Sequence, residues 1–536
     1  MGKMSAAATK IDLEKFRLRR FVERMVEMGE MDVRDEPVAL TRLSEIIEGT
    51  PKGVLFRKAG PEQVEIAAKV LGGRARIAAA FDTTVDKFGD EYHKRMATPQ
   101  EVVEIPSGDA PVHEVVMTGK DVDLTKLPFH PQHEFDGSCY LSSGIDYTID
   151  PETGRTNVGS RRLSLRNRNT TGTNVTAPSD LKRIYQGCVK RGEKLPITFT
   201  IGSHPLDMFA ATSRRPGDEI SLVAQFRGEP AAVVKSITND ILVPADAEAT
   251  LEGYLDENGY VELEGPFGEF FGYYGAIHKD PVFHCTAITM RRDAMYQTLL
   301  HGSAFSLDQS DGAVMSAMRT EAEAMKILRA TVREPIAVHM RETSGGSCTL
   351  LVSMRQRIVG EARSAIAALF GGMLRLKHIM VFDEDIDVFN DKQVGWALGT
   401  RFQADRDLIV LQGMMGMSQD PSLDGRRTGA KAGFDCTRPF GCDGQIPFTR
   451  CAAKVFKPSA KFKSVEEALR SEPMYYAQIV EALGSDDGRD VACALDELRQ
   501  AGGLGRDRDG RYHLMSAKPG TTGIVGELYH DPNVGT

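Results

Sequence analysis

Hydrophobic residues in the first part of the chain change from helical to strand-like spacing. Over residues 13–28 they recur every three to four positions, which predicts an amphipathic helix with one buried face. Residues 51–56 then have the pattern of a turn that leads into a strand. We therefore expect residues 1–111 to form a small α/β domain.

Strand patterns dominate the next part of the chain, and Gly and Pro interrupt them at short intervals. This arrangement is typical of a β-barrel or a β-sandwich, which we assign to residues 112–305. The strands are predicted at residues 140–149, 196–201, 219–226, 231–237 and 283–290.

Helical spacing returns at residues 313–332, where acidic and basic residues are interleaved, and it predicts a linker helix within residues 306–332. Residues 333–460 alternate between strand and helix patterns and are expected to form a second α/β domain. Its strands are predicted at residues 336–340, 349–354 and 378–382, and its helix at residues 356–374.

The final segment, residues 461–536, is predicted to contain two short helices and a hairpin with an Asp-Gly turn. Helices over 474–483 and 491–501, followed by a hairpin over 506–513, have the outline of a winged helix. Acidic residues outnumber basic ones here, which argues against DNA binding, so we interpret the segment as a packing or partner-contact module. The whole chain is thus predicted to be a multidomain α/β protein.

Composition narrows the class of protein. With 536 residues the chain is too long for one hydrophobic core, and its net charge of −9 gives no electrostatic reason to expect a nucleic-acid partner. No apolar run approaches the roughly 20 residues of a membrane span, and residues 1–10 lack a signal-peptide core. We therefore expect a cytoplasmic location without a membrane partner. The eight cysteines form no CxxC pair, which favours reduced thiols over a zinc site.

The clearest candidate for chemistry is the segment from Glu264 to Glu269, with the sequence Glu-Gly-Pro-Phe-Gly-Glu, taken together with Arg162. Proline restricts φ and the glycines permit a tight path, so the two carboxylates keep a defined separation. With an arginine they form a set that is suited to moving one proton. The alternative is a surface turn with two solvated glutamates, and the six residues alone favour neither interpretation.

Further motifs follow in a fixed order between residues 121 and 424, and with them the chain resembles the UbiD family of prenylated-FMN-dependent (de)carboxylases. No single motif is specific, but their order and spacing together match the family. The matching segments are residues 123–128, 148–157, 195–205, 233–235, 243–248, 251–253, 264–274, 377–387 and 396–401.

The resemblance implies the residues of a catalytic site. Arg162, Glu264 and Glu269 match the Glu-Arg-Glu network of the family, in which Glu269 would be the acid that protonates carbon after carbon dioxide leaves. For Arg162 the alternative is a simple salt bridge.

The resemblance also implies a cofactor. The family holds prenylated FMN in a split β-barrel, with the phosphate against a divalent metal ion, usually Mn²⁺, and with K⁺ nearby. Asn157, Asp180 and Glu219 match the metal ligands, but Asp180 stands where the family has a histidine, so the identity of the metal stays open. Lys377 matches a lysine that contacts the phosphate; the alternative is a solvated lysine ahead of a buried strand. The expected cofactor-binding residues are Asn157, Ser160, Arg161, Arg162, Asp180, Glu219 and Lys377.

Arginines are dense near these positions. On a strand, Arg162, Arg166 and Arg168 would share one face, which could meet the flavin phosphate or an anionic substrate such as a dicarboxylate or a coenzyme A thioester. The alternative is a solvated edge strand. The arginines concerned are Arg161, Arg162, Arg166, Arg168, Arg214 and Arg215.

The sequence therefore predicts a carboxy-lyase that decarboxylates an aromatic or α,β-unsaturated acid reversibly and without oxidation, with prenylated FMN as the electron sink. The resemblance further implies a homo-oligomer, a dimer or a hexamer, with contacts in the C-terminal domain, and a flavin prenyltransferase that supplies the cofactor. Two alternatives remain. A flavin-reductase-like oxidoreductase would have no use for the Glu-Arg-Glu set, and a non-catalytic subunit of a carboxylase complex would be expected to have lost part of it.

Overall fold

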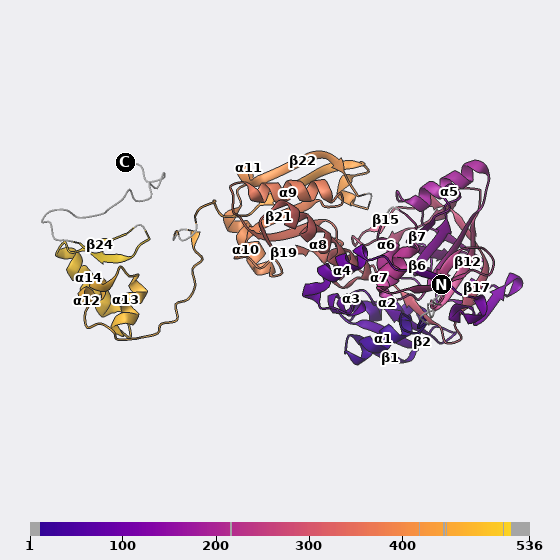
Figure 1. Ribbon diagram of the computed structural model, residues 1–536, viewed down its shortest axis with the longest axis horizontal. Helices are drawn as coiled ribbons and strands as arrows, with labels where there is room; N and C mark the ends of the chain where they lie inside the picture. Colours follow the sequence, from indigo (N-terminus) through magenta and orange to yellow (C-terminus); the bar gives the residue numbers. More distant parts are fainter. Residues whose placement is uncertain are drawn as a thin grey trace, which may run out of the picture. The chain divides into compact units, whose positions relative to one another are not determined.

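A computed structural model describes residues 11–214, 217–417, 419–442, 445, 448–507 and 509–515. The chain divides into two compact units, with the division between Thr437 and Arg438 (Figure 1). Both units contain helices and strands, which confirms the prediction of a multidomain α/β fold. The finer domain boundaries given above stay predictions.

The N-terminal part of the first unit is a four-stranded sheet with helices packed against it. The sheet has the order β1-β2-β3-β18, and its last strand comes from far along the chain and pairs in parallel with β3. The predicted first helix is present but begins later than expected. The elements are α1 (Leu18–Glu27), β1 (Met31–Val38), α2 (Leu43–Glu48), β2 (Gly53–Ala59), β3 (Val64–Ala68), α3 (Arg74–Ala80), α4 (Phe88–Ala97) and β18 (Met295–Thr298).

A closed barrel forms the centre of the unit. Six strands follow one another in the order β12-β9-β6-β7-β8-β17, and pairing of β12 with β17 closes the ring, while β5 extends it beside β17. This confirms the predicted β-barrel. The strands are β5 (Val115–Thr118), β6 (Tyr140–Ile149), β7 (Thr156–Leu165), β8 (Thr170–Thr173), β9 (Leu195–Ile201), β12 (Ala249–Leu255) and β17 (Val282–Met290).

Helices α5 (Asp180–Arg191), α6 (Pro205–Thr212) and α7 (Ser221–Arg227) accompany the barrel. A three-stranded sheet of order β11-β10-β4 completes this region. Its strands are β4 (Val102–Glu104), β10 (Ala231–Lys235) and β11 (Leu242–Pro244).

The prediction of a strand over residues 219–226 is wrong, because the structure has helix α7 there. Residues 222–227 are all buried, so the apolar run has no polar face whose period would separate a buried helix from a buried strand. Gly228, at φ +76°, ends the helix in the left-handed conformation that glycine adopts without strain.

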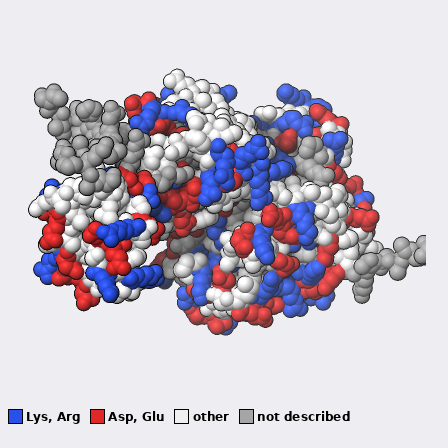
Figure 2. All heavy atoms as spheres, turned by 60° about the vertical axis from the view of Figure 1, so that its left-hand side comes forward, with Lys and Arg blue, Asp and Glu red and all other residues white. Residues whose placement is uncertain are grey.

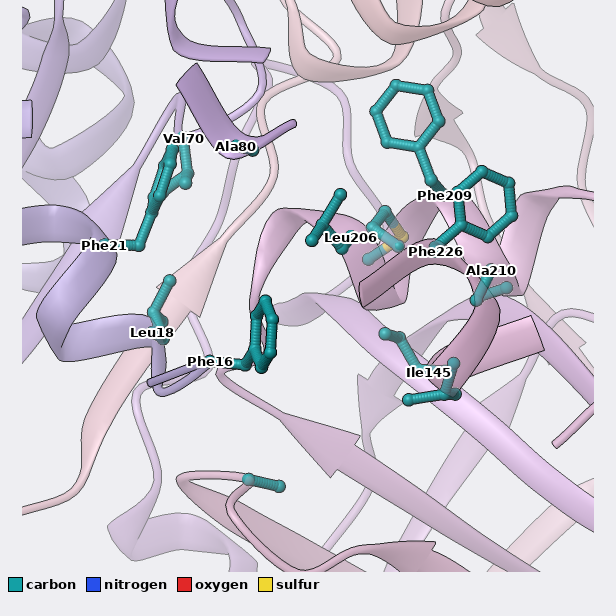
Figure 3. Close-up of a cluster of buried hydrophobic side chains, with 14 of the residues drawn as sticks. Phe16, Leu18, Phe21, Val70, Ala80, Ile145, Leu206, Phe209, Ala210 and Phe226 are labelled. Carbon is teal, nitrogen blue, oxygen red and sulfur yellow. The ribbon is translucent and has the colours of Figure 1, made fainter. Parts of the chain in front are cut away.

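The N-terminal part and the barrel helices share one hydrophobic core. Figure 3 shows Phe16 and Phe21 from the N-terminal segment in the same buried cluster as Phe209 of α6 and Phe226 of α7. Burying each such side chain contributes about 1.5–3 kcal/mol. The shared core therefore fixes the N-terminal part against the barrel.

Two short hairpin ladders lie between β12 and β17 in sequence and carry the candidate catalytic segment. Strand β13 pairs with β16 in antiparallel register, and β14 pairs with β15. Their bounds are β13 (Glu262–Glu264), β14 (Phe267–Gly268), β15 (Tyr274–Gly275) and β16 (His278–Asp280).

The predicted linker helix is α8 (Asp311–Thr331), which leads into a five-stranded sheet of order β19-β20-β21-β23-β22. Buried residues of α8 and α9 pack with those of the sheet in one cluster, and α9 lies over the sheet in Figure 1. The remaining elements are β19 (Glu334–Met340), β20 (Thr349–Arg355), α9 (Glu361–Gly372), β21 (His378–Asp383), α10 (Asp391–Arg401), α11 (Ala404–Asp407), β22 (Leu408–Met415) and β23 (Thr428–Asp435).

The second unit has the winged-helix outline that the sequence predicts, with one helix more than expected. Met474 bridges to Tyr512 of the hairpin, and the helices bury a core of their own. The predicted extension also includes residues 516–536, which lie outside the described residues. The elements are α12 (Val465–Ser471), α13 (Tyr476–Leu483), α14 (Arg489–Gln500), β24 (Leu504–Arg506) and β25 (Tyr512–Leu514).

Charges of both signs are mixed over the face of the molecule that Figure 2 shows, with one larger group of basic residues. Among the described residues, no helix combines the length and the apolar character that a membrane crossing requires.

Candidate active site

Arg162 binds two carboxylates at once. Its Nε and Nη2 donate to the two oxygens of Glu264 at 2.9 and 3.0 Å, and its Nη1 donates to Glu269 Oε1 at 2.9 Å. Bidentate, charge-assisted bonds of this kind are stronger than neutral ones and fix the plane of both partners. The structure thus brings together three residues that lie up to 107 positions apart.

The local backbone explains how two glutamates reach one arginine. Arg162 lies on β7, and Glu264 is the last residue of β13. The Gly265–Pro266 peptide bond is cis, and Gly265 has φ +90°, a conformation that glycine adopts readily. The centre of the Phe267 ring then lies 4.2 Å from the Arg162 Cζ, so the ring supports the guanidinium from one face. Glu269 follows two residues later.

The two carboxylates have different environments. The side chain of Glu264 is 1% exposed, receives two N–H groups from Arg162 and lies 3.3 Å from His278 Nε2. The side chain of Glu269 is 16% exposed and accepts a single N–H from the same arginine. Glu264 is therefore held between two basic groups, whereas Glu269 is the more accessible carboxylate.

A cavity of about 250 Å³ lies next to this group. Phe270, which follows Glu269, lines it, and so does His301, whose ring stands edge-on to Phe267 at 5.7 Å. The walls come from the barrel, from α5, from the segment between α6 and α7, from α8 and from the part of the first unit that contains the five-stranded sheet. The lining residues include Asn157, Ser160, Arg161, Asp180, Arg214, Glu219, Phe270, His301, Met315, Arg319 and Arg375.

The three predicted metal ligands come from different elements and meet at this cavity. Asn157 lies on β7, Asp180 is the first residue of α5, and Glu219 precedes α7. Glu219 Oε2 accepts the Val158 N–H at 2.8 Å. Burial, together with the nearby carboxylates of Asp180 and Asp146, raises the pKa of Glu219 above its usual value. The side chains offer only oxygen atoms to a cation, as hard cations prefer, and their role as ligands stays a prediction.

The buried carboxyl group of Asp146 lies near these predicted metal ligands. Burial raises its pKa, and Arg161, whose Nε is 3.9 Å from Asp146 Oδ1, opposes that rise. Within the described residues neither oxygen of Asp146 has a hydrogen-bond partner. Arg161 also donates to the carbonyl oxygen of Ser160 at 2.7 Å. The predicted cofactor residues Ser160 and Arg161 thus belong to a polar wall of the cavity in which some buried polar atoms have no hydrogen-bond partner among the described residues.

Lys377 lies away from this set. Its Nζ donates to Asp420 Oδ2 at 2.7 Å and to Ser422 Oγ at 2.6 Å, and it lines a second cavity within the C-terminal domain. Arg375, two residues earlier, lines both cavities. Lys377 therefore does not line the first cavity with Asn157, Asp180 and Glu219, and its ammonium group is paired with Asp420.

The prediction that Arg162, Arg166 and Arg168 share one strand face is wrong. Strand β7 ends at Leu165, so the period-two spacing stops before the last two arginines. Arg166 and Arg168 are exposed, and neither lines the first cavity. Arg166 donates to a backbone carbonyl oxygen, and Arg168 lies 3.5 Å from a carboxylate.

Several lining residues carry no local sequence signal. Arg214, named above only as one of a dense group of arginines, lines the cavity together with Arg319 of α8 and Arg375. Arg215, from the same group, lies outside the described residues. Burial, then the positive charges of the two other arginines, lowers the pKa of Arg375. Burial also lowers the pKa of His301 to about 4, so its ring is neutral near pH 7. These residues come from separate segments, and only the fold brings them together.

Comparison with known protein families shows the family to which this chain belongs. A family model described as the 3-octaprenyl-4-hydroxybenzoate carboxy-lyase Rift-related domain matches residues 103–304, and the model of the C-terminal domain of the same enzyme matches residues 313–436. The chain belongs to the UbiD family. The two matches span the barrel, α8 and the five-stranded sheet, and they confirm the resemblance.

Characterised relatives in the UbiD family share most of their length with this chain. The anhydromevalonate phosphate decarboxylase of Methanosarcina mazei is 30% identical over 426 residues, which covers 78% of this chain and 96% of the relative. The phenolic acid decarboxylase of Sedimentibacter hydroxybenzoicus is 29% identical, with 79% and 91% covered. Enzymes named as decarboxylases are carboxy-lyases, and this UbiD-family chain is an enzyme of that class.

Solved UbiD-class structures have the same fold. HmfF from Pelotomaculum thermopropionicum, in complex with FMN, matches with a TM-score of 0.76 at 28% identity, covering 81% of this chain and 97% of HmfF. An evolved dimeric form of HmfF in complex with prFMN matches with a TM-score of 0.72 at 26% identity, covering 82% and 97%. The vanillic acid decarboxylase of Sedimentibacter hydroxybenzoicus in its open form matches with a TM-score of 0.70 at 26% identity, covering 85% and 98%.

Proposed function

We propose that this UbiD-family carboxy-lyase uses prenylated FMN to decarboxylate an aromatic or α,β-unsaturated carboxylic acid, reversibly and without net oxidation. The observation that carries the proposal is the contact of Arg162 with both Glu264 and Glu269 beside a polar cavity. The HmfF structures with FMN and with prFMN support a flavin as the cofactor.

The residues around the cavity fit a flavin phosphate bound through a cation. Asn157, Asp180 and Glu219 offer amide and carboxylate oxygens from three elements. Arg161 Nε is a buried polar atom without a hydrogen-bond partner in the described part of the chain, and Arg161 lines the cavity. These residues would hold the phosphate, a divalent ion that we propose to be Mn²⁺, and K⁺ nearby. Asp180 gives the site one more negative charge than the histidine of the family would.

Prenylated FMN, when bound, supplies an electron sink for the loss of carbon dioxide. The protein supplies orientation and the proton. Arg162 keeps both carboxylates in place, and Glu264 remains the anion that orients Arg162. Glu269 donates one proton to the substrate carbon that loses carbon dioxide, and in the reverse direction the same carboxylate removes it.

The cavity also limits the substrate. Phe270, the neutral His301 and Met315 form its less polar wall, which suits an aromatic or conjugated carbon skeleton. Solvent exclusion by such a wall strengthens the charge interactions of the neighbouring Arg162.

A second anionic group on the substrate is supported by arginines other than those expected from the sequence. Arg214, Arg319 and Arg375 line the cavity, and none of them forms an ion pair with a carboxylate among the described residues, although Glu323 is near enough for its charge to act on Arg319. Arg319 is half-buried and donates to the carbonyl oxygen of Thr212. Because guanidinium groups without a counter-charge favour an anion, we propose an aromatic dicarboxylate or its coenzyme A thioester.

The decisive experiment is co-expression with a flavin prenyltransferase, followed by mass and absorption measurements on the bound flavin. Carbon dioxide release is then measured across matched mono-acids, di-acids and thioesters. We expect the mass of prenylated FMN and carbon dioxide release that is lost in Glu269→Gln. Purified protein that holds prenylated FMN yet releases carbon dioxide from none of these acids would contradict the proposal. An oxidoreductase would instead consume a reduced nicotinamide, and a non-catalytic subunit would show neither activity alone.

We also propose a homo-oligomer with contacts in the C-terminal domain of this chain. Strand β22 is an edge of the five-stranded sheet and carries exposed apolar residues, Val410 at 48% and Met415 at 52%. Unpaired edges with apolar side chains favour association. Light scattering after size-exclusion chromatography tests this, and a monomer at working concentrations would contradict it.

A further inference from the structure

His278 is in direct contact with Glu264, one of the two catalytic glutamates. It lies on β16 opposite Glu264 on β13. Its Nε2 is 3.3 Å from Glu264 Oε2 and 3.2 Å from Asp280 Oδ2, and its Nδ1 is 2.8 Å from the carbonyl oxygen of Ala276. A carbonyl oxygen only accepts, so Nδ1 carries a hydrogen, and a second hydrogen on Nε2 satisfies the carboxylates. The contacts are those of an imidazolium.

The surroundings favour the charged form of this ring. Asp280 is fully buried, and its other oxygen accepts the Val175 N–H at 3.3 Å. The charged groups that face His278 among the described residues are Asp280 and Glu264, with Arg162 on the far side of Glu264. The hydrogen bond to Asp280, then the hydrogen bond to the carbonyl oxygen of Ala276 and the charges of Asp280 and Glu264, raise the pKa of His278 above its usual value, against the effect of burial.

The same three ligand atoms lie within 4.8 Å of one another, which is also close enough to bind a metal ion. Arg162 already takes both oxygens of Glu264, however, at 2.9 and 3.0 Å. A cation there would have to compete with the guanidinium, so the hydrogen-bonded imidazolium is the better description.

This placement makes the two catalytic carboxylates unequal. Glu264 lies between Arg162 and His278, whereas the carboxylate of Glu269 is paired with Arg162 alone among the described residues. If His278 were neutral, both glutamates would depend on one arginine, and a single proton would be divided between them. With His278 charged, the Glu264 carboxylate has two cationic partners and the Glu269 carboxylate has one, so a negative charge is better compensated at Glu264.

We propose that His278 is a positioning residue that keeps Glu264 ionised, so that the one transferable proton of the pair resides on Glu269. The inference rests on the proposed role of Glu269 as the proton donor. It assigns to His278 no contact with substrate or cofactor, only the choice of which carboxylate carries the proton.

The first test needs no cofactor. Hydrogen–deuterium exchange at the imidazole C2 position, followed by mass spectrometry of the full-length protein across pH, reports the titration of each histidine. We expect His278 to titrate above the ordinary histidine value, and Asp280→Asn to move that titration to lower pH. His113 serves as the internal control, since burial lowers its pKa independently of Asp280. A His278 that titrates at or below the ordinary value, or a divalent ion found at this group, would overturn the inference.

The second test measures kcat and KM against pH in the flavin-loaded enzyme. The wild-type kcat should fall as pH rises through the His278 titration, because the neutral ring no longer holds Glu264. His278→Gln should lower kcat about tenfold at neutral pH with KM nearly unchanged, as expected when one charge-assisted hydrogen bond is lost. The kcat of His278→Gln should also lack that pH dependence. His278→Lys should recover part of the lost kcat. Asp280→Asn should move the decrease of kcat to lower pH.

His284→Gln is the matched control. His284 also pairs with an aspartate, with its Nε2 2.9 Å from Asp256 Oδ2, but it lies on β17 and contacts neither catalytic glutamate. This variant should keep wild-type kinetics.

The two tests separate the inference from the proposed function. If Glu269→Gln loses turnover while His278→Gln keeps the wild-type kcat and pH profile, the role of His278 is wrong and the proposed function stands. If Glu269→Gln turns over normally, the proposed function of Glu269 fails, and the inference about His278 fails with it even where exchange shows an imidazolium.

Discussion

Glutamine substitutions at Glu269 and Glu264, made one at a time, should separate the proton donor from the anion that orients Arg162. In Glu269→Gln the retained Oε1 can still accept the Arg162 N–H that the wild type receives at 2.9 Å. Shape and hydrogen bond are kept, and only the proton is lost. General acids contribute about 10²–10⁴-fold, so kcat should fall at least about 10²-fold, which corresponds to ~2.7 kcal/mol. Flavin content, KM and stability should stay close to wild type.

Glu264→Gln should behave differently, because a carboxamide cannot replace the bidentate contact. Arg162 donates to both oxygens of Glu264. The Gln side chain can accept one of these N–H groups but must turn its own NH₂ toward the other. Removing one partner of a buried ion pair costs about 3–5 kcal/mol, and the lower end applies here because Arg162 keeps Glu269. We expect lower stability and lower kcat together.

The assay combines carbon dioxide release, flavin absorbance and denaturant unfolding for both variants and the wild type. The signature is one variant that is inactive but stable and a second that is both inactive and destabilised. If Glu269→Gln retained wild-type turnover, or if it were the destabilised variant while Glu264→Gln was stable, the roles derived from the asymmetric contacts of Arg162 would be refuted.

Three further outcomes follow from other parts of the structure. Glu219→Ala should lose the divalent ion and the flavin together, measured by metal analysis and absorbance, and full flavin occupancy without any divalent ion would contradict the metal assignment. Arg319→Ala should raise KM for di-acids or coenzyme A thioesters by about tenfold or more, as expected for a lost charge-assisted contact, and leave mono-acids unchanged; equal effects on all substrates, or loss of flavin, would contradict a substrate role. Phe209→Ala should lower the free energy of unfolding by about 3–5 kcal/mol in denaturant titrations, because its side chain is fully buried in the core shared by the N-terminal part and the barrel; a loss below about 1 kcal/mol would show that this core does not hold the two parts together.

Elements with an unambiguous period could be predicted from the sequence. Strand β6 occupies the predicted residues 140–149, and α8 lies within two residues of the predicted 313–332. Both patterns are long and bounded by turn signals, so local propensity and tertiary packing agree. Helix α7 could not be told from a strand, because burial on all sides leaves no periodic polar face.

Charge density along the chain was a poor guide to position in space. Arg166 and Arg168 follow Arg162 closely in sequence, but they leave the strand and remain exposed. Arg319 and Arg375 lie far from Arg162 in sequence and line the cavity. Whether an arginine faces a site depends on where its strand or helix ends, and that is settled by packing of the whole fold.

By itself the sequence indicated the family, a β-barrel or a β-sandwich in the central part, and Arg162, Glu264 and Glu269 as the candidate catalytic residues, because these are carried by motif order and by residue type. Only the tertiary structure decided that Glu264 contacts both Arg162 and His278, since His278 reaches Glu264 through the pairing of β13 with β16. The physical reason is that a hydrogen bond or an ion pair depends on separations of about 3 Å, and spacing along a chain does not specify such separations between segments that are distant in sequence.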